Sequence, residues 1–117
     1  MNKPSDRLES FDHNMEAYNF AIDIQKQRIQ AELKWLDDNY DNIDALKYYF
    51  LSIMNFNNQL QYAQYAARLN ACSSQQIQGM VDQRASLLYY NLQVLDSKKF
   101  ENKPLKAIIQ MLKTQNR

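Results

Sequence analysis

The chain is almost free of charge at residues 48–81, which read YYFLSIMNFNNQLQYAQYAARLNACSSQQIQGMV. Arg68 is the only fully charged side chain in this stretch, and the others are apolar, aromatic or neutral amide. A helix at a protein surface normally carries charged residues on its outer face. The pattern therefore predicts a central helix that is covered on more than one side, either by the rest of the chain or by a partner.

The composition favours a helical fold. The chain has 117 residues, with one Gly and two Pro, and so few turn-forming residues argue against a fold with many strands. A chain of this length forms one domain with a modest core. We therefore expect an all-α protein in which residues 1–117 make a single helical-bundle domain.

Four helices are predicted from the spacing of apolar residues. Between Leu8 and Leu36 these residues recur every seven positions, which predicts a long amphipathic helix capped by Ser5. Further helices are expected over Ile43 to Leu69, Ser74 to Phe100 and, in a short C-terminal piece, Leu105 to Lys113. Because short connections make neighbouring helices antiparallel, the predicted architecture is an antiparallel bundle of three long helices plus a short C-terminal helix.

Capping residues and an apolar stripe support the second and third of these helices. Asp41 or Asn42 is expected to cap the second helix, and Ser73 with Gln76 fits a capping box at the start of the third. The main apolar stripe of the second helix is expected at Leu46, Ile53, Leu60 and Ala67.

We expect neither an export signal nor a membrane span. Asp6, Arg7 and Glu9 interrupt the first apolar residues, and the apolar run from Tyr48 to Met54 is far shorter than the ~20 residues that a bilayer requires. We expect a cytoplasmic protein without a membrane partner. The many Asn, Lys, Ile and Tyr residues suit the AT-rich genome of a bacterium or phage.

The sequence lacks the residue sets that catalysis and cofactor binding need. His13 is the only histidine, which excludes a di-iron site with two Glu-x-x-His motifs and a zinc site with two histidines. We expect His13 to pair with Glu9 or Glu16 at the surface. The lone Cys72 has no histidine other than His13 to activate it, and one glycine cannot form a phosphate-binding loop. We predict a protein that is not an enzyme and that takes no cofactor or metal.

Tyrosines and amides of the middle helices indicate a protein-binding surface. The chain has eight tyrosines, and several do not fit the apolar stripes of their helices. Tyr with Asn and Gln, without Lys and Glu, is typical of protein interfaces. Alternatively, these tyrosines only cover the bundle and leave their hydroxyls in water. The predicted partner-binding residues are Tyr48, Asn55, Asn58, Tyr62, Tyr65 and Tyr90.

Basic residues gather at the C-terminal end although the net charge is only +1. One interpretation is a solvated end that complements helix C-termini. The other is a patch for nucleic-acid phosphates, although nucleic-acid-binding domains are usually basic overall. The candidate phosphate contacts are Lys98, Lys99, Lys103, Lys106 and Lys113.

Taken together, these features favour an interaction role. We expect a non-catalytic protein–protein interaction module that acts as a small subunit, a chaperone or adaptor, or an inhibitor of a larger complex. Its partner would be another protein, either a second copy in a homodimer or a larger complex. A nucleic-acid-associated subunit that uses the basic C-terminal segment is the alternative, and a ligand-binding bundle with an amide-rich interior is a third hypothesis.

Overall fold

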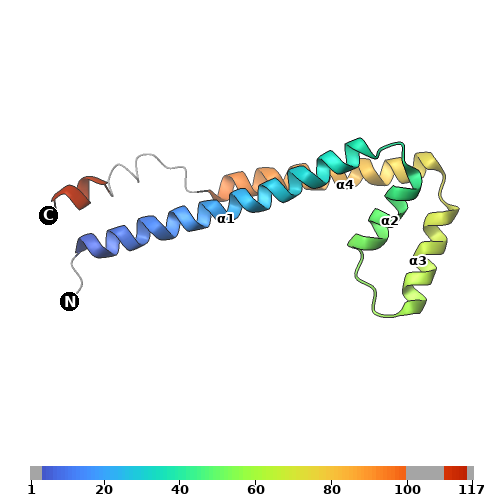
Figure 1. Ribbon diagram of the computed structural model, residues 1–117, viewed down its shortest axis with the longest axis horizontal. Coiled ribbons are helices and arrows are strands. Elements are labelled where there is room, and N and C mark those ends of the chain that lie inside the picture. The colour runs from blue at the N-terminus through green and yellow to red at the C-terminus, as the bar shows by residue number, and fades with distance from the viewer. Residues whose placement is uncertain (1–3, 100–109, 116–117) are drawn as a thin grey trace. The chain divides into compact units, whose positions relative to one another are not determined.

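The computed structural model describes residues 4–99 and 110–115, and within these ranges no residue lies in a strand (Figure 1). The prediction of an all-α fold is therefore confirmed. The helices are α1 (Pro4–Asp38), α2 (Ile43–Ile53), α3 (Gln59–Ala71) and α4 (Ser74–Lys98). Residues 110–115 are also helical, whereas the predicted start of the C-terminal helix at Leu105 lies outside the described residues.

Backbone packing divides the chain into two compact units, which are described separately below. Unit 1 comprises Met1–Arg28 and Leu92–Arg117, and unit 2 comprises Ile29–Asn91. Since α1 and α4 each cross the boundary between these ranges, each unit contains a part of both helices.

In unit 1, two ion pairs join α1 to the end of α4 and the residue that follows it. Lys99 Nζ lies 2.8 Å from Asp23 Oδ1, and Lys26 pairs with Asp96. Residue numbers rise along α1 as they fall along the partner segment, so the two run antiparallel. Met15 and Ile22 of α1 are buried in this unit, and they follow the predicted seven-residue spacing.

Unit 2 contains an apolar core to which all four named helices contribute. Its buried side chains are Leu36, Leu46, Phe50, Leu69, Ile77, Val81 and Leu88. The turn after α1 is tied to α4 by polar contacts. The Tyr40 hydroxyl donates to the Asp82 carboxylate at 3.2 Å, and the Gln78 amide donates to the Tyr40 carbonyl oxygen at 3.1 Å.

Two predicted helix starts are confirmed. The Asn42 side chain accepts a hydrogen bond from the Ala45 N–H at the start of α2. Before α4, the Ser73 hydroxyl accepts from the Gln76 N–H at 3.1 Å, and the Gln76 side chain accepts from the Ser73 N–H at 2.7 Å. This reciprocal pair is the predicted capping box.

The prediction of one helix over Ile43 to Leu69 is wrong, because the chain leaves the helix at Met54 and enters α3 at Gln59. The Asn58 side-chain oxygen caps α3 by accepting from the Gln61 N–H at 2.9 Å. The Gln61 side chain accepts in turn from the Asn57 N–H at 3.0 Å. Asn favours such caps and turns over helix interiors, and three Asn residues fall between Met54 and Gln59.

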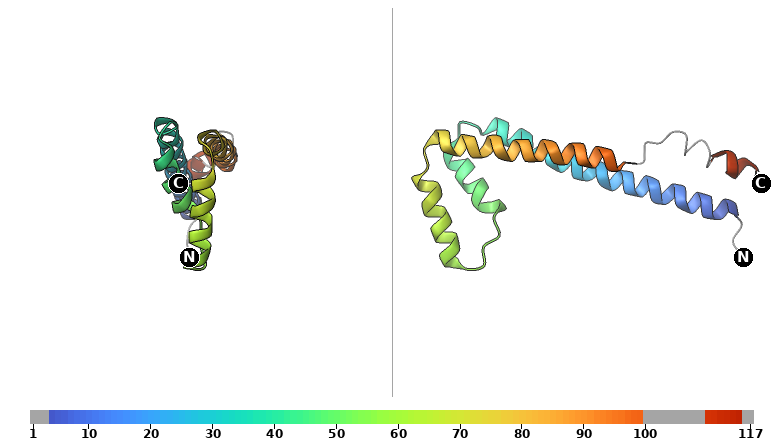
Figure 2. Two further views of the ribbon diagram at one scale, coloured as in Figure 1. Left: turned by 90° about the vertical axis from the view of Figure 1, so that its right-hand side faces the viewer. Right: turned by 180° about the vertical axis from the view of Figure 1, so that it is seen from behind.

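The two short helices turn back on each other. α2 and α3 are in contact and run in opposite directions, which Figures 1 and 2 show from three sides. We call residues Ile43–Ala71 with their connecting loop the α2–α3 hairpin. Because this hairpin replaces one of the long helices, the predicted bundle of three long helices is not confirmed.

Candidate functional site

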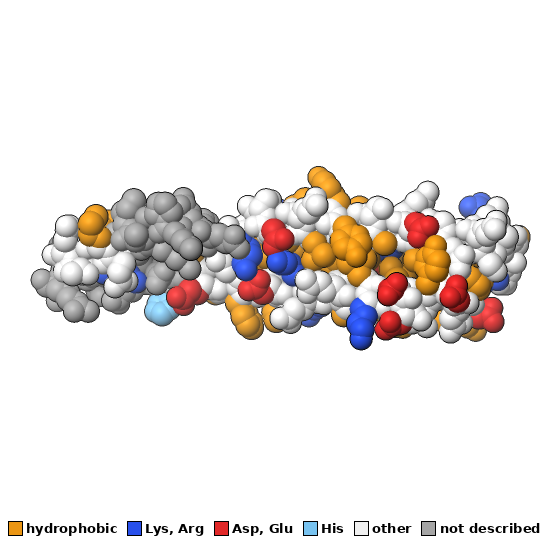
Figure 3. Space-filling view, turned by 90° about the horizontal axis from the view of Figure 1, so that it is seen from above, with side chains coloured by type: hydrophobic (Ala, Val, Ile, Leu, Met, Phe, Trp, Pro, Cys, Tyr) orange, Lys and Arg blue, Asp and Glu red, His pale blue; other side chains and the backbone are white. Residues whose placement is uncertain are grey.

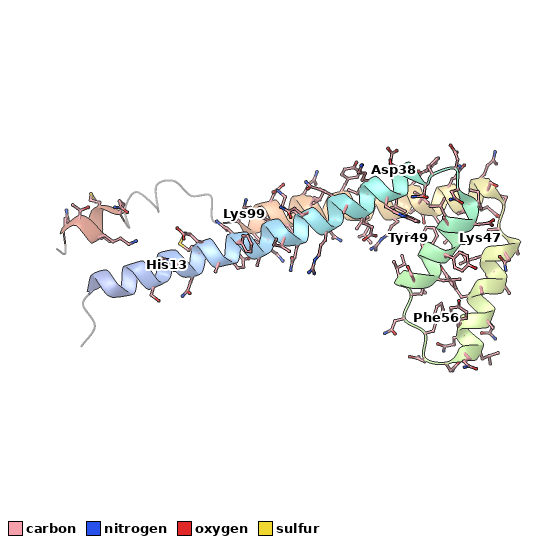
Figure 4. The ribbon with its side chains drawn as sticks, viewed as in Figure 1. His13, Asp38, Lys47, Tyr49, Phe56 and Lys99 are labelled. Carbon is pink, nitrogen blue, oxygen red and sulfur yellow. The ribbon has the colours of Figure 1, made fainter. Side chains whose placement is uncertain are left out.

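Aromatic rings hold the loop of the α2–α3 hairpin. Phe56 lies in this loop between the two helices (Figure 4). Its ring centroid is 5.4 Å from that of Tyr62, with the rings nearly perpendicular at 82°, and 5.6 Å from that of Tyr65. The edge-to-face contact of Phe56 with Tyr62 contributes ~0.5–1.5 kcal/mol, whereas the Phe56 and Tyr65 rings are tilted at 52°. Two of the predicted partner-binding tyrosines therefore also have a structural role.

The predicted partner-binding tyrosines differ in exposure. Tyr48 is 73% exposed, Tyr62 is 47% exposed and Tyr90 is 63% exposed. Tyr65 is half-buried and packs against the core of unit 2, and this burial raises the pKa of its hydroxyl. Tyr65 thus has the smallest surface to offer a partner.

The structure brings Tyr48 and Tyr62 to one groove of the hairpin. The groove has a volume of about 390 Å³. Its buried and half-buried lining side chains include Leu51, Ala66 and Leu69, and the two tyrosines line it from different helices. The charged residues Asp44 and Lys47 also line the groove, so the sequence-predicted pair is part of one concave surface of mixed polar and apolar character.

Two other predicted residues, Asn55 and Tyr65, line a second hollow of about 230 Å³, which shares no residue with the groove. Asn58 uses its side-chain oxygen to cap α3. Tyr90 lies on α4 and lines neither hollow. The predicted residues are therefore distributed over several places rather than over one face.

Sequence reasoning missed three exposed apolar residues of the hairpin. Ile53 and Leu60 were expected in the core stripe, but they are 41% and 66% exposed, and Met54 between them is 46% exposed. Because the helix is interrupted between them, Ile53 and Leu60 no longer lie on the same side of one helix. The cluster of Asn residues was the sequence signal that could have predicted this break. With the two groove tyrosines these residues form what we call the hairpin surface: Tyr48, Ile53, Met54, Leu60 and Tyr62.

Few charged residues lie near this surface in the sequence, although Asp44 and Lys47 line the groove beside the two tyrosines. From Tyr48 to Ala67 the sequence has no Lys, Arg, Asp, Glu or His. The face of α1 and α4 in Figure 3 differs, because acidic and basic side chains surround its hydrophobic ones. The hairpin surface therefore combines exposed apolar groups with few charged neighbours.

A polar cluster in unit 2 links α2 to α1 and α4. The Glu32 carboxylate accepts from the Arg84 guanidinium, at 2.9 Å from Nη2 and 3.0 Å from Nε, and from the Tyr49 hydroxyl. The Trp35 ring stacks on Tyr49 at 5.4 Å. Burial, and then the hydrogen bond to Glu32, raise the pKa of Tyr49 to about 12. Tyr49 therefore stays a neutral donor at ordinary pH, and the cluster positions the hairpin.

Three of the predicted phosphate contacts, Lys98, Lys99 and Lys113, lie among the described residues. Lys98 is exposed, Lys99 is bound to Asp23, and Lys113 is half-buried (Figure 4 labels Lys99). Lys103 and Lys106 lie outside the described residues. Phosphate binding by this segment stays a prediction.

His13 lies at the surface, as predicted. Its Nδ1 is 3.9 Å from Glu16 Oε2, and the two side chains are 80% and 64% exposed. Among the described residues, no group of three or more His, Cys, Asp or Glu side chains is placed to hold a metal ion. Within the same residues, no helix has the length and apolar character that a membrane crossing requires.

Comparisons with protein-family models, with curated proteins and with solved structures find no match for this chain, so its role has to be inferred from its own residues.

Proposed function

We propose that this chain is a non-catalytic protein–protein interaction module that binds its partner through the α2–α3 hairpin. The proposal depends mainly on the hairpin surface, whose five apolar side chains are between 41% and 73% exposed. Single exposed apolar residues are ordinary, but several of them on one short hairpin favour an interaction site. Burying such a group against a partner releases roughly 25 cal/mol per Å² of apolar area.

The groove and its tyrosines supply a binding mode. An amphipathic helix of a partner can lie between α2 and α3, since grooves between helices accept helices by their apolar faces. Tyr is one of the residues that dominate the binding energy of interfaces, and Tyr48 and Tyr62 line the groove from opposite helices. In this proposal the partner's helices complete the antiparallel bundle that the sequence predicts.

The remainder of the chain presents the hairpin. The cluster of Glu32, Tyr49 and Arg84 fixes α2 against both long helices, which lowers the entropic cost of ordering the surface on binding. A small subunit, an adaptor or chaperone, and an inhibitor of a larger complex all fit such a module. Cys72, whose thiol contacts the Arg68 carbonyl oxygen at 3.2 Å, is a free cysteine, in keeping with a reducing cytoplasm.

Site-specific photo-crosslinking in the native host tests the proposal. A photoreactive amino acid replaces Tyr48 or Leu60 of the hairpin in separate variants, and Leu87 of α4 is the control position, since it is 49% exposed. We expect covalent adducts with a protein, a second copy included, at positions 48 and 60 and at most a trace at position 87. The absence of adducts at both hairpin positions, or equal adducts at position 87, would contradict the proposal.

A further inference from the structure

Resting on the proposed function, we infer that the partner places the guanidinium group of an arginine side chain in a hollow that α1 and α2 line. The hollow has a volume of about 490 Å³, and its lining residues are Trp35, Ala45, Tyr48, Tyr49 and Ser52. We call these five residues the aromatic hollow. Tyr48 lines the groove of the hairpin as well, so a partner that binds the groove also reaches the aromatic hollow.

Helical spacing brings the rings of the aromatic hollow together. Its lining positions on α2 are 45, 48, 49 and 52, which are three or four residues apart and so share one side of the helix. Trp35 of α1 stacks on Tyr49, with ring centroids 5.4 Å apart. Because Trp35 is 39% exposed and Tyr48 is 73% exposed, the side chain of a partner can reach both rings.

Aromatic surface of this kind attracts cations. The face of a Trp or Tyr ring carries partial negative charge, and the cation found over it more often is the Arg guanidinium. Arg stacks its planar group on rings and donates hydrogen bonds in a fixed geometry, whereas the Lys ammonium is compact and strongly hydrated. The Ser52 hydroxyl donates to the Tyr49 carbonyl oxygen at 2.6 Å, which leaves the Ser52 oxygen to accept a bond from a guanidinium.

An aspartate without an ionic partner lies beside the hollow. Asp38 follows Trp35 by three residues, so the two side chains are neighbours on the surface of α1 (Figure 4 labels Asp38). Asp38 is exposed and forms no ion pair within the part of the chain that the structure describes. An apolar occupant that covered Asp38 would take this charge out of water without a partner, which is costly. A guanidinium supplies the opposite charge instead.

The charges near the hollow also favour a cation. Arg84 Nε lies 3.1 Å from the Tyr49 hydroxyl, but Arg84 Nη2 is 2.9 Å from the Glu32 carboxylate, so this pair adds no net charge. The segment at positions 34–47 joins Trp35 to the lining residues of α2, and it carries four aspartates against two lysines. The excess of aspartates attracts a positive group.

Fluorescence of Trp35 measures binding at the hollow directly, because Trp35 is the only tryptophan of the chain. The full chain is titrated with N-acetyl-arginine amide, with its uncharged isostere N-acetyl-citrulline amide, and with N-acetyl-lysine amide. We expect a saturable change with the arginine probe, which should bind about threefold more tightly than either of the others. Equal binding of the citrulline probe would overturn the choice of a cation, and equal binding of the lysine probe would overturn the choice of arginine.

Variants of the hollow locate the bound probe. Tyr48→Ala should weaken binding of the arginine probe about threefold, and Asp38→Asn should weaken it about twofold. Asp37→Asn is the matched control, because it removes the same charge at a position that does not share the side of α1 on which Trp35 lies. All three side chains are exposed, so each variant should keep its helical circular dichroism. Unchanged binding in Tyr48→Ala, or equal losses in the two aspartate variants, would contradict the inference.

Photo-crosslinking from position 52 in a lysate of the native host connects the hollow to the partner. We expect an excess of the arginine probe to lower the yield of protein adducts at this position, and the citrulline probe to leave it unchanged. Adducts that both probes displace equally, or that neither displaces, would overturn the inference. The interaction module then stands if positions 48 and 60 still form adducts. If neither position forms adducts, the module fails, and the assignment of the arginine to a protein partner fails with it.

Discussion

At the scale of single residues, Tyr48 and Tyr49 are neighbours in the sequence but have different roles in the structure. Tyr49 is half-buried, stacks on Trp35 and donates to Glu32, whereas Tyr48 is 73% exposed and lines the groove. The apolar spacing of the sequence already separates them, since only Tyr48 was predicted to bind a partner. Their different environments follow from α2's orientation against α1 and α4.

We therefore expect removal of the hydroxyl to reduce the stability of the fold at Tyr49 but not at Tyr48. We expect Tyr49→Phe to lower the free energy of unfolding by about 1 kcal/mol, because the half-buried Glu32 loses one of its hydrogen-bond donors. Tyr48→Phe is the matched control and should change stability by less than about 0.5 kcal/mol, as an exposed substitution does. Urea unfolding followed by circular dichroism measures both, and equal losses in the two variants would refute the assigned role.

The raised pKa of Tyr49 also predicts a dependence on pH. The folded pKa of about 12 lies above the ordinary tyrosine pKa of 10.0, so the folded chain holds this proton more tightly than the unfolded chain does. The stabilisation is complete below pH 10 and is lost as the pH rises from 10 to 12. Thermal unfolding over this interval should show a steeper loss in the wild type than in Tyr49→Phe. Parallel curves would mean that Tyr49 does not titrate in this way.

At the scale of elements, the break between α2 and α3 is the feature that sequence reasoning did not find. Ile53 and Leu60 are seven positions apart and imitate one continuous stripe, because a seven-residue spacing returns to almost the same side of a helix. Local hydrogen bonds of Asn57, Asn58 and Gln61 prevail over that periodicity. Periodicity indicates which residues would share a face of a continuous helix, but it does not indicate where a helix is interrupted.

We therefore expect the stability of the fold to depend on the side-chain cap of α3. We expect Asn58→Ala to cost about 1 kcal/mol, because the Gln61 N–H loses its acceptor. Asn55→Ala in the same loop is the control, since Asn55 is exposed and lies outside the cap. Hydrogen exchange of the first-turn amides of α3 should accelerate in the first variant alone, and unchanged exchange there would exclude the cap as a determinant of the break.

At the scale of the whole molecule, sequence patterns predicted the all-α class, the end of α1, the start of α4 and part of the core. Leu36 and Leu46 lie on predicted stripes and are buried. The candidate surface was predicted in part, since the absence of charge pointed to the hairpin, and Tyr48 with Tyr62 lines one groove. Its apolar members were missed, because their exposure depends on how the chain turns at residues 54–58.

The two ion pairs of unit 1 also help to fix the alignment of α1 with the end of α4 and the residue that follows it. Asp23 pairs with Lys99, and Lys26 pairs with Asp96. Sliding one segment by about one turn in one direction brings Asp23 opposite Asp96, and sliding it in the other direction brings Lys26 opposite Lys99. Like charges placed together repel. Four side chains thus oppose a slip of about one turn in either direction, because each such slip replaces an attraction between opposite charges by a repulsion between like charges.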